Sequence, residues 1–278
     1  MKKGGKYSIM DIKKSKKKFA LILGCSSGFG GATAIRLAQD GYMIFGVHLD
    51  RKQTQYKVDE IKNEIKKHGK APVFFNVNAA AADKRQEVVR KIRDTLPAGE
   101  YIQVFLHSLA FGTLKPYIAD NPEEAINQAN IDMTLDVMAH SLVYWVQDLY
   151  WAKLLGFGSR IFAMTSYGST HVVPYYGAVS TAKAALESHI RQLAMELAPI
   201  GATANAIRGG VTNTPALQKI PGHEKMIHAA IERNPGRRLT TPEDVANAIS
   251  VFAGDDCQWM NGNVIGVDNA EAVVDYIK

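Results

Sequence analysis

Short apolar runs alternate along the chain with longer stretches in which apolar residues recur at helical spacing. Seven runs predict β-strands, at residues 19–23, 43–48, 72–77, 102–107, 160–164, 203–207 and 263–267. A helix is predicted between Thr241, as its cap, and Gly254, with Pro242 at its first position. Alternation of this kind predicts an α/β fold, with a seven-stranded, mostly parallel, doubly wound sheet and helices on both faces.

The chain divides into a basic leader and one long folded region. Residues 1–18 hold eight lysines and a single acid, Asp11, although the whole chain carries only +6. The remainder is therefore close to neutral, which argues against nucleic-acid binding. No linker or internal repeat interrupts residues 19–278. We predict a flexible arm at 1–18 and a single domain at 19–278.

Composition excludes several classes of protein. With 278 residues, of which 46% are hydrophobic and 22% charged, the chain is neither disordered nor fibrous. Two cysteines exclude a disulfide scaffold and favour the cytoplasm. No apolar run reaches the roughly 20 residues of a membrane helix. Histidines and cysteines lack ligand spacing, so we expect no metal site.

Glycines follow the first predicted strand. The segment Gly24-Cys25-Ser26-Ser27-Gly28-Phe29-Gly30 lies between that strand and a stretch of helical spacing. A glycine-rich turn in this position lets backbone N–H groups and the positive end of a helix approach a pyrophosphate. The sequence predicts a Rossmann-type dinucleotide site that contains Gly24, Ser26, Ser27, Gly28, Phe29 and Gly30.

The GxxxGxG spacing resembles the short-chain dehydrogenase/reductase family, and the resemblance covers nearly the whole chain after residue 18. In that family, residues after the second strand distinguish a 2′-hydroxyl from a 2′-phosphate on the adenosine. Here His48 stands where an acid would select the hydroxyl, and Arg51 and Lys52 follow it. These residues favour NADPH. Asp50 favours NADH, which stays open as the alternative.

The lysine of the family's catalytic pair is present as Lys183, but its usual tyrosine is missing. Four positions before the lysine stands Val179, which can neither donate a proton nor stabilise an oxyanion. The nearest phenol is Tyr176, seven positions before Lys183, almost two helical turns or about 10 Å along the axis. That spacing suits an oxygen remote from the carbon that receives hydride, such as the carbonyl of an enoyl thioester.

This Y-x6-K arrangement resembles the enoyl-(acyl carrier protein) reductases, a divergent branch of the family. His107-Ser108-Leu109-Ala110-Phe111 is similar to the HSxAF segment of that branch, and Asp132 replaces the usual asparagine. Gly209–Thr214 matches the segment that contacts the nicotinamide amide and the pyrophosphate. The resemblance implies further cofactor contacts from Asn76, Val77, Ser108, Leu109, Ala110, Lys183, Gly210, Val211, Thr212 and Thr214.

The same resemblance implies the catalytic roles. Tyr176 would stabilise charge on the substrate oxygen, and Lys183 would hold the nicotinamide ribose. Thr165 aligns with the family's catalytic serine and either contacts a substrate oxygen or is structural. Many enoyl reductases have a second tyrosine ten residues before the catalytic one. Here that position is Ser166, so either Tyr167 substitutes or the role is absent.

We therefore predict an NAD(P)H-dependent enoyl-(acyl carrier protein) reductase of fatty acid synthesis, acting on trans-2-enoyl thioesters of acyl carrier protein or coenzyme A. Two alternatives stay open. One is a related reductase for a ketone, a dienoyl-CoA or a steroid, and the other is a non-enzymatic dinucleotide sensor or scaffold.

Two further segments bear on partners. Residues 215–238 lie where this fold usually carries a mobile lid over the substrate. Aromatic residues crowd 138–155, the region with which family members form tetramers, so a homotetramer is expected. Core packing would also explain them. The residues concerned are Tyr144, Trp145, Tyr150 and Trp151.

Overall fold

The computed structural model describes residues 17–275. Sixteen of the eighteen residues of the predicted arm therefore lie outside the described residues. The last two already contact the domain, because the carbonyl of Lys18 accepts a hydrogen bond from Met43 N at 2.8 Å, and that of Lys17 accepts one from Gln103 Nε2 at 2.7 Å.

Seven strands form one sheet in the order β3-β2-β1-β4-β5-β6-β7. Every neighbouring pair is parallel, so the predicted doubly wound sheet is confirmed. The strands are β1 (Phe19–Leu23), β2 (Met43–His48), β3 (Val73–Asn76), β4 (Val104–His107), β5 (Arg160–Thr165), β6 (Thr203–Gly209) and β7 (Val264–Val267).

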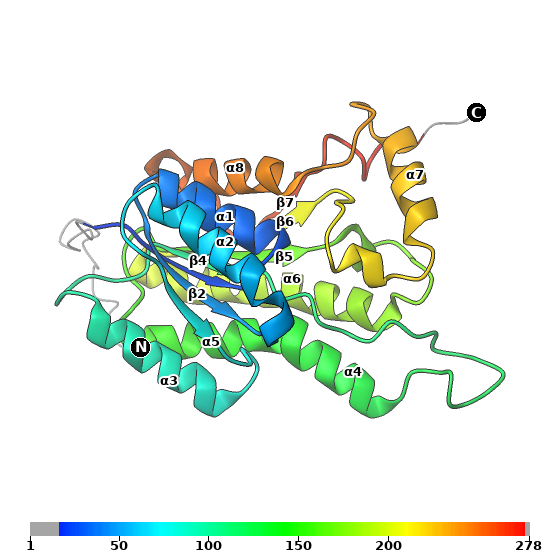
Figure 1. Ribbon diagram of the computed structural model, residues 1–278, viewed down its shortest axis with the longest axis horizontal. Helices are drawn as coiled ribbons and strands as arrows, with labels where there is room; N and C mark the ends of the chain where they lie inside the picture. Colours follow the sequence, from blue (N-terminus) through cyan, green and yellow to red (C-terminus); the bar gives the residue numbers. More distant parts are fainter. Residues whose placement is uncertain (1–16, 276–278) are drawn as a thin grey trace, which may run out of the picture.

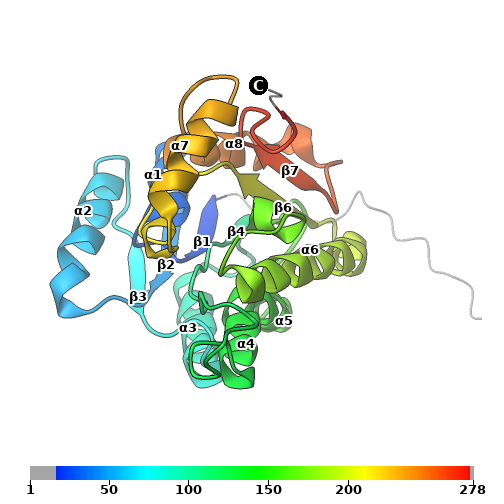
Figure 2. The same ribbon diagram turned by 90° about the vertical axis from the view of Figure 1, so that its right-hand side faces the viewer.

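Helices cover both faces of the sheet, as predicted (Figures 1 and 2). One layer consists of α1 (Gly28–Gln39), α2 (Gln55–Lys66) and α8 (Pro242–Phe252). The other contains α3 (Ala82–Thr95), α4 (Gln128–Leu135), α5 (Ser141–Trp151) and α6 (Gly177–Leu197). Helix α7 (His223–Arg233) stands apart from both layers, beyond the carboxyl end of β6 (Figure 1).

The first strand shows why an uninterrupted apolar run forms the centre of this sheet. Phe19, Leu21 and Leu23 pack into the core under α3, α5 and α6, whereas Ala20 and Ile22 pack under α1 and α8. Successive side chains of a strand point to opposite faces. Because both faces are buried, no position in β1 tolerates a polar residue.

The predicted cap of α8, Thr241, is also confirmed. Thr241 accepts a hydrogen bond from Asp244 N at 3.2 Å, and the carboxylate of Asp244 accepts one from Thr241 N at 2.9 Å. This reciprocal pair satisfies two backbone donors at the start of the helix. It fixes where α8 begins and therefore where the preceding connection from α7 must end.

From β1 the strand order proceeds through β2 to β3 at one edge of the sheet, and from β4 it proceeds through β5 and β6 to β7 at the other edge. The direction of the strand order therefore changes between β1 and β4. In open α/β sheets, ligands bind at the carboxyl ends of the strands at such a point. The carboxyl ends of β1 to β6 and the segments that follow them contain the predicted site residues. Among the described residues, no helix has both the length and the apolar character needed to cross a membrane.

Candidate active site

The glycine-rich turn packs backbone against backbone. Gly24 has φ of +80°, and a Cβ on it would overlap the carbonyl of Ser108. A Cβ on Gly30 would in turn overlap the carbonyl of Gly24. Ser108 N donates to Leu23 O at 3.0 Å, which holds the Ser108–Ala110 segment beside the turn. Both positions require glycine, because a side chain at either one would collide with the backbone.

The beginning of α1 is open to an anion. Ser27 is its N-cap residue in an extended conformation, and no side chain caps the helix. Gly28 has φ of +52° and lies beside the methyl group of Thr214. Uncapped N–H groups at a helix N-terminus suit a phosphate, so these residues fit a dinucleotide's pyrophosphate. The ring of Phe29 packs against Gly209 and the core under α1 and α8. Phe29 therefore contributes its backbone, and not its ring, to the candidate pyrophosphate site.

At the end of β2, Asp50 is the centre of a hydrogen-bonded group. Its carboxylate accepts from Thr54 Oγ1 at 2.9 Å, lies 3.0 Å from His48 Nδ1 and bonds to Ser26 of the glycine-rich turn. Burial raises the pKa of Asp50, but the hydrogen bonds from Ser26, Thr54 and His48 outweigh it and hold that pKa below its usual value. A charged carboxylate therefore stands beside the turn.

The neighbouring strand end is fixed by the side chain of Asn76. Its Oδ1 accepts from Asp50 N at 3.0 Å and its Nδ2 donates to Asp50 O at 2.9 Å. Val77 N donates to His48 O at 2.8 Å. Asn76 thus orients the backbone of Asp50, while Arg51 lies exposed.

Tyr176 stands at the N-cap position of α6, next to the turn Tyr167–Ser169 that follows β5. A Cβ on Gly168 would lie 2.8 Å from the tyrosine ring, so the ring packs directly over this glycine. Burial raises the pKa of the Tyr176 phenol, and a hydrogen bond with Ser166 partly opposes the rise. Ser166 and Tyr176 therefore form a hydroxyl pair, whose contact the sequence did not indicate.

Lys183 is buried two turns further along α6. Its Nζ donates to Met164 O, at the end of β5, at 2.8 Å. Burial lowers the pKa of Lys183 to about 8, although Glu187 on the next turn opposes the shift. The hydroxyl of Thr165 donates to Glu187 Oε1 at 2.6 Å in a buried environment. Contact between Thr165 and a substrate oxygen thus stays a prediction, since its donor is used by Glu187.

Val179 belongs to the core. Its side chain is 4% exposed. Together with the side chains of Thr134 and Met138, it packs around Gly112. No phenol occupies the site four residues before Lys183, as the sequence indicated. On the exposed side of α6, Tyr117 Oη lies 3.1 Å from Thr181 Oγ1, so the connection between β4 and α4 covers the start of this helix.

His107, at the end of β4, is a buried residue near Lys183. It is fully buried, and its Nε2 lies 2.8 Å from Ser141 Oγ. Burial, assisted by the charge of Lys183, lowers the pKa of His107 to about 3. The imidazole is therefore neutral and adds no positive charge beside the lysine.

Tyr167 begins the short helical turn that follows β5. Its ring stacks on His171 at a centroid distance of 3.7 Å, and the guanidinium of Arg233, from α7, lies 5.1 Å from it. This cation–π contact connects the segment after β5 to the predicted lid. The role of Tyr167 as the second tyrosine stays a prediction.

The loop after β6 completes the arrangement. Thr212 donates to Gly210 O at 3.0 Å, and Thr214 accepts from Leu217 N at 3.2 Å. Val211 N donates to the carboxylate of Glu271, a residue near the end of the chain. Sequence reasoning missed Glu187 and Glu271, because each acts through a partner that is distant in the sequence.

Comparisons with known proteins show what the chain is similar to. The family model described as "Enoyl-(Acyl carrier protein) reductase" matches residues 24–269. The chain is 26% identical over 261 residues to a 1-cyclohexenylcarbonyl-CoA reductase of Streptomyces collinus, covering 93% of this chain and 88% of that protein. It is 29% identical over 171 residues to the enoyl-(acyl-carrier-protein) reductase (NADH) of Aquifex aeolicus, covering 60% of this chain and 61% of that protein.

A solved structure gives the same result for the fold. The crystal structure of the enoyl-(acyl-carrier-protein) reductase (NADH) from Aquifex aeolicus superposes with a TM-score of 0.81 at 23% sequence identity. The match covers 94% of this chain and 98% of that one. At this identity the likeness concerns the fold alone.

Proposed function

Because the chain belongs to the enoyl-(acyl carrier protein) reductase family, within the short-chain dehydrogenases/reductases, we propose that it reduces the 2,3 double bond of trans-2-enoyl thioesters. The arrangement of Tyr176 and Lys183 is the observation that carries this proposal. A phenol stands at the start of α6, a buried lysine lies seven residues later, and Val179 fills the position of the ketone-type tyrosine. Both relatives named above are called reductases of acyl thioesters.

The residues of this chain suit a nicotinamide dinucleotide. The uncapped start of α1 would hold the pyrophosphate, and Lys183 would hold the nicotinamide ribose. When bound, the reduced nicotinamide supplies the hydride, and the protein supplies binding and orientation.

For the identity of the cofactor, the structure favours NADH over the NADPH that the sequence suggested. The charged carboxylate of Asp50 lies beside Ser26, so it would accept hydrogen bonds from ribose hydroxyls and repel a 2′-phosphate. Arg51, which favoured NADPH, is exposed. The Aquifex aeolicus relative carries NADH in its name.

The roles of the side chains follow from their positions. Hydride addition at the β-carbon leaves negative charge on the thioester oxygen. The Tyr176 O–H would donate a hydrogen bond to that oxygen, and Ser166 would hold the phenol in place. The ammonium of Lys183 would lower the phenol's pKa when the substrate is bound, because a nearby cation favours the charged form. Protonation of the α-carbon then completes the reduction.

The proposal also covers the carrier of the acyl group, the oligomeric state, the pathway and the location in the cell. Acyl carrier protein and coenzyme A are both candidate carriers, since each occurs in the name of a relative. We also propose a homotetramer, a role in fatty acid synthesis and a cytoplasmic location. The face of α5 that would form the oligomer exposes Tyr144, Tyr150 and Trp151, whereas Trp145 is fully buried and donates to Ala79 O. Trp145 is therefore a core residue.

The decisive experiment follows absorbance at 340 nm with purified protein and crotonyl-CoA, with NADH and NADPH in parallel. A 3-oxoacyl-CoA serves as the control substrate. We expect oxidation of NADH driven by the enoyl substrate. Turnover with the 3-oxoacyl substrate alone would indicate a ketone reductase, and cofactor binding without any turnover would favour the sensor.

A further inference from the structure

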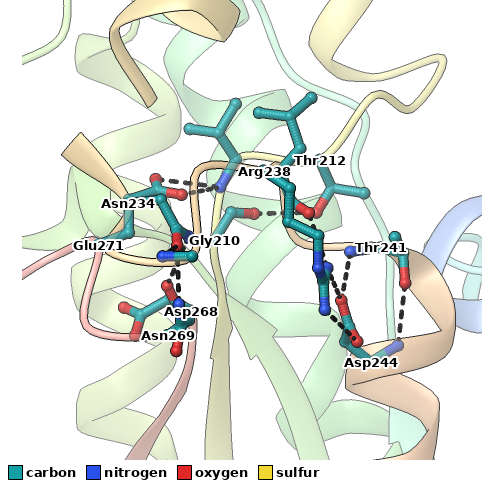
Figure 3. Close-up of polar contacts among 12 residues, drawn as sticks. Gly210, Thr212, Asn234, Arg238, Thr241, Asp244, Asp268, Asn269 and Glu271 are labelled. Atoms are coloured by element: carbon teal, nitrogen blue, oxygen red, sulfur yellow. Dashed lines mark hydrogen bonds and ion pairs between the residues drawn. The ribbon is translucent and has the colours of Figure 1, made fainter. Parts of the chain in front are cut away.

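The segment that follows β7 lies beneath the loop after β6. Glu271 is 3% exposed, and Val211 N donates to both oxygens of its carboxylate, at 3.1 and 3.3 Å (Figure 3). The contact is close along the loop, because a Cβ on Gly210 would lie 2.9 Å from Glu271 Oε2. The carboxylate thus supports the backbone of Gly210 and Val211 directly.

An unusual turn aims this carboxylate. Asn269 and Ala270 have φ of +48° and +64°, the left-handed region that non-glycine residues rarely adopt. Consecutive strained residues persist only where their surroundings hold them. Here the buried side chain of Asn234 does so, because it donates to Asp268 O at 3.2 Å and accepts from Asn269 Nδ2 at 2.8 Å (Figure 3). This turn directly precedes Glu271 in the chain.

The charge of Glu271 is shared with the candidate lid. Arg233, the last residue of α7, places its guanidinium 3.9 Å from Glu271 Oε1 and 5.1 Å from the ring of Tyr167. Asp268, the other acid nearby, is paired with Arg208 at 3.3 Å. The single charge pair of Arg233 and Glu271 therefore joins α7, the segment after β5 and the loop after β6.

The supported loop extends across the candidate cofactor site. At one end, Thr214 lies beside Gly28 at the beginning of α1, where the pyrophosphate would bind. At the other end, Val211 follows the strand that pairs with β5, in which Thr165 lies opposite Arg208. Val211 is thus on the side of the site that contains Ser166 and Tyr176, where the nicotinamide would lie.

We propose that Glu271 is a positioning residue that orients the 210–214 loop for the nicotinamide half of the cofactor, with Arg233 as its counter-ion. This inference rests on the proposed binding of a nicotinamide dinucleotide, but not on the enoyl substrate. It assigns the C-terminal segment a role in holding one half of the ligand. The adenosine half depends on Asp50 and the glycine-rich turn instead.

The test compares NADH with ADP-ribose, which lacks the nicotinamide. Fluorescence or calorimetric titration would give the Kd of each ligand for the wild type, Glu271→Ala, Glu271→Gln and the control Glu60→Gln, on the exposed face of α2. We expect Glu271→Ala to raise the Kd of NADH about tenfold, the effect of about one lost hydrogen bond, and to leave that of ADP-ribose within about twofold. Glu271→Gln keeps an acceptor for Val211 and should restore most of the NADH affinity.

Each other outcome overturns the proposal. Unchanged NADH affinity in Glu271→Ala would show that the carboxylate does not orient the loop. Glu271→Ala could instead lose affinity equally for NADH and ADP-ribose, for example because it fails to fold. If Glu271→Gln then kept both affinities, Glu271 would have a general structural role. A wild-type protein that binds ADP-ribose but not NADH would refute this inference and the proposed use of NADH together, whereas unchanged NADH affinity in Glu271→Ala refutes this inference alone. Binding of neither ligand would refute the dinucleotide function as well.

Discussion

At the level of single residues, the proposed role of Tyr176 can be tested because its side chain is held at two places. The ring is held by Gly168 beneath it and by Ser166 at its hydroxyl. Removal of the hydroxyl should therefore leave the ring in place. We expect Tyr176→Phe to lower kcat by roughly 10²–10³-fold, the usual effect of losing one oxyanion donor, while the Kd of NADH is nearly unchanged.

A neighbouring residue provides the matched control for this variant. Tyr175 is 46% exposed, and Tyr175→Phe makes the same chemical change one residue away. Steady-state kinetics with crotonyl-CoA should show full activity in this control. If Tyr176→Phe matched it, the phenol would have no part in the reaction.

Ser166 gives a second prediction at this scale. Ser166→Ala removes the hydrogen bond that orients the Tyr176 hydroxyl but not the hydroxyl itself. We expect a fall in kcat of about tenfold, smaller than in Tyr176→Phe, because a single orienting hydrogen bond contributes about 1 kcal/mol. Kinetic measurements on the double variant should show no further loss beyond Tyr176→Phe. An additive loss would mean that Ser166 acts independently of the phenol.

The lowered pKa of Lys183 predicts that the activity depends on pH. Its pKa is lowered from 10.5 to about 8, so the ammonium is lost from the folded protein as the pH rises through about 8. If the charged form is needed, kcat/KM should decline above this pH. Stability should move in the opposite direction, since between about pH 8 and 10.5 the unfolded chain binds a proton that the folded one does not.

Lys183→Met separates these effects from other titrations. The variant should have low activity without the decline near pH 8, and its free energy of unfolding should lack the increase between pH 8 and 10. Urea titrations at several pH values measure the second quantity. An unaltered pH profile in Lys183→Met would assign the titration to another group.

At the scale of elements, the capping box places α8 and the connection before it. Thr241→Ala removes the acceptor for Asp244 N, and loss of such a cap costs about 1 kcal/mol. We expect a decrease in Tm of roughly 2–4 °C, measured by calorimetry. Thr241→Ser keeps the acceptor and should retain the Tm of the wild type. Equal decreases in both variants would show that the threonine methyl group, not the cap, is responsible.

The elements also show which parts of the structure are readable from the sequence. β1 was predicted with its observed limits, because Lys18 and Gly24 flank its apolar run. β2 was also predicted with its observed limits. β6 continues two residues beyond the prediction, through Arg208 and Gly209, since backbone pairing with β5 and β7 does not require apolar side chains. The prediction also missed the π-helical turn Asp136–His140 between α4 and α5, which interrupts no apolar pattern.

The sequence predicted those parts of the candidate site whose residues lie close together in the chain. The glycine-rich turn and the spacing of Tyr176 and Lys183 each lie within one short segment. Contacts between segments were not readable. The bond between Ser166 and Tyr176 depends on the turn after β5, and that between Glu271 and Val211 joins positions 60 residues apart. The placement of Asp50 beside Ser26 likewise required the fold, and it is the observation on which the proposed preference for NADH rests.

For the whole molecule, the exposed aromatic side chains of α5 predict self-association. Trp151 is 65% exposed and Tyr150 40%, although neither shields the core of the monomer. Exposed apolar groups of this size usually mark an interface. We expect the protein to behave in sedimentation velocity as a tetramer of the 30.5 kDa chain. The Trp151→Asp variant should shift toward smaller species, since a charge would be buried there without a partner.

The control must change an equally exposed aromatic residue elsewhere. Tyr56 is 57% exposed and belongs to α2, a helix that lies on a different side of the molecule from α5 (Figure 2). Tyr56→Asp should leave the tetramer intact. Dissociation in both variants would mean that added negative charge acts generally, and a monomeric wild type would mean that these aromatic residues serve another contact. If Trp151→Asp dissociates and also loses enoyl reductase activity at equal fold content, assembly stabilises the adjacent α6 and hence the position of Tyr176.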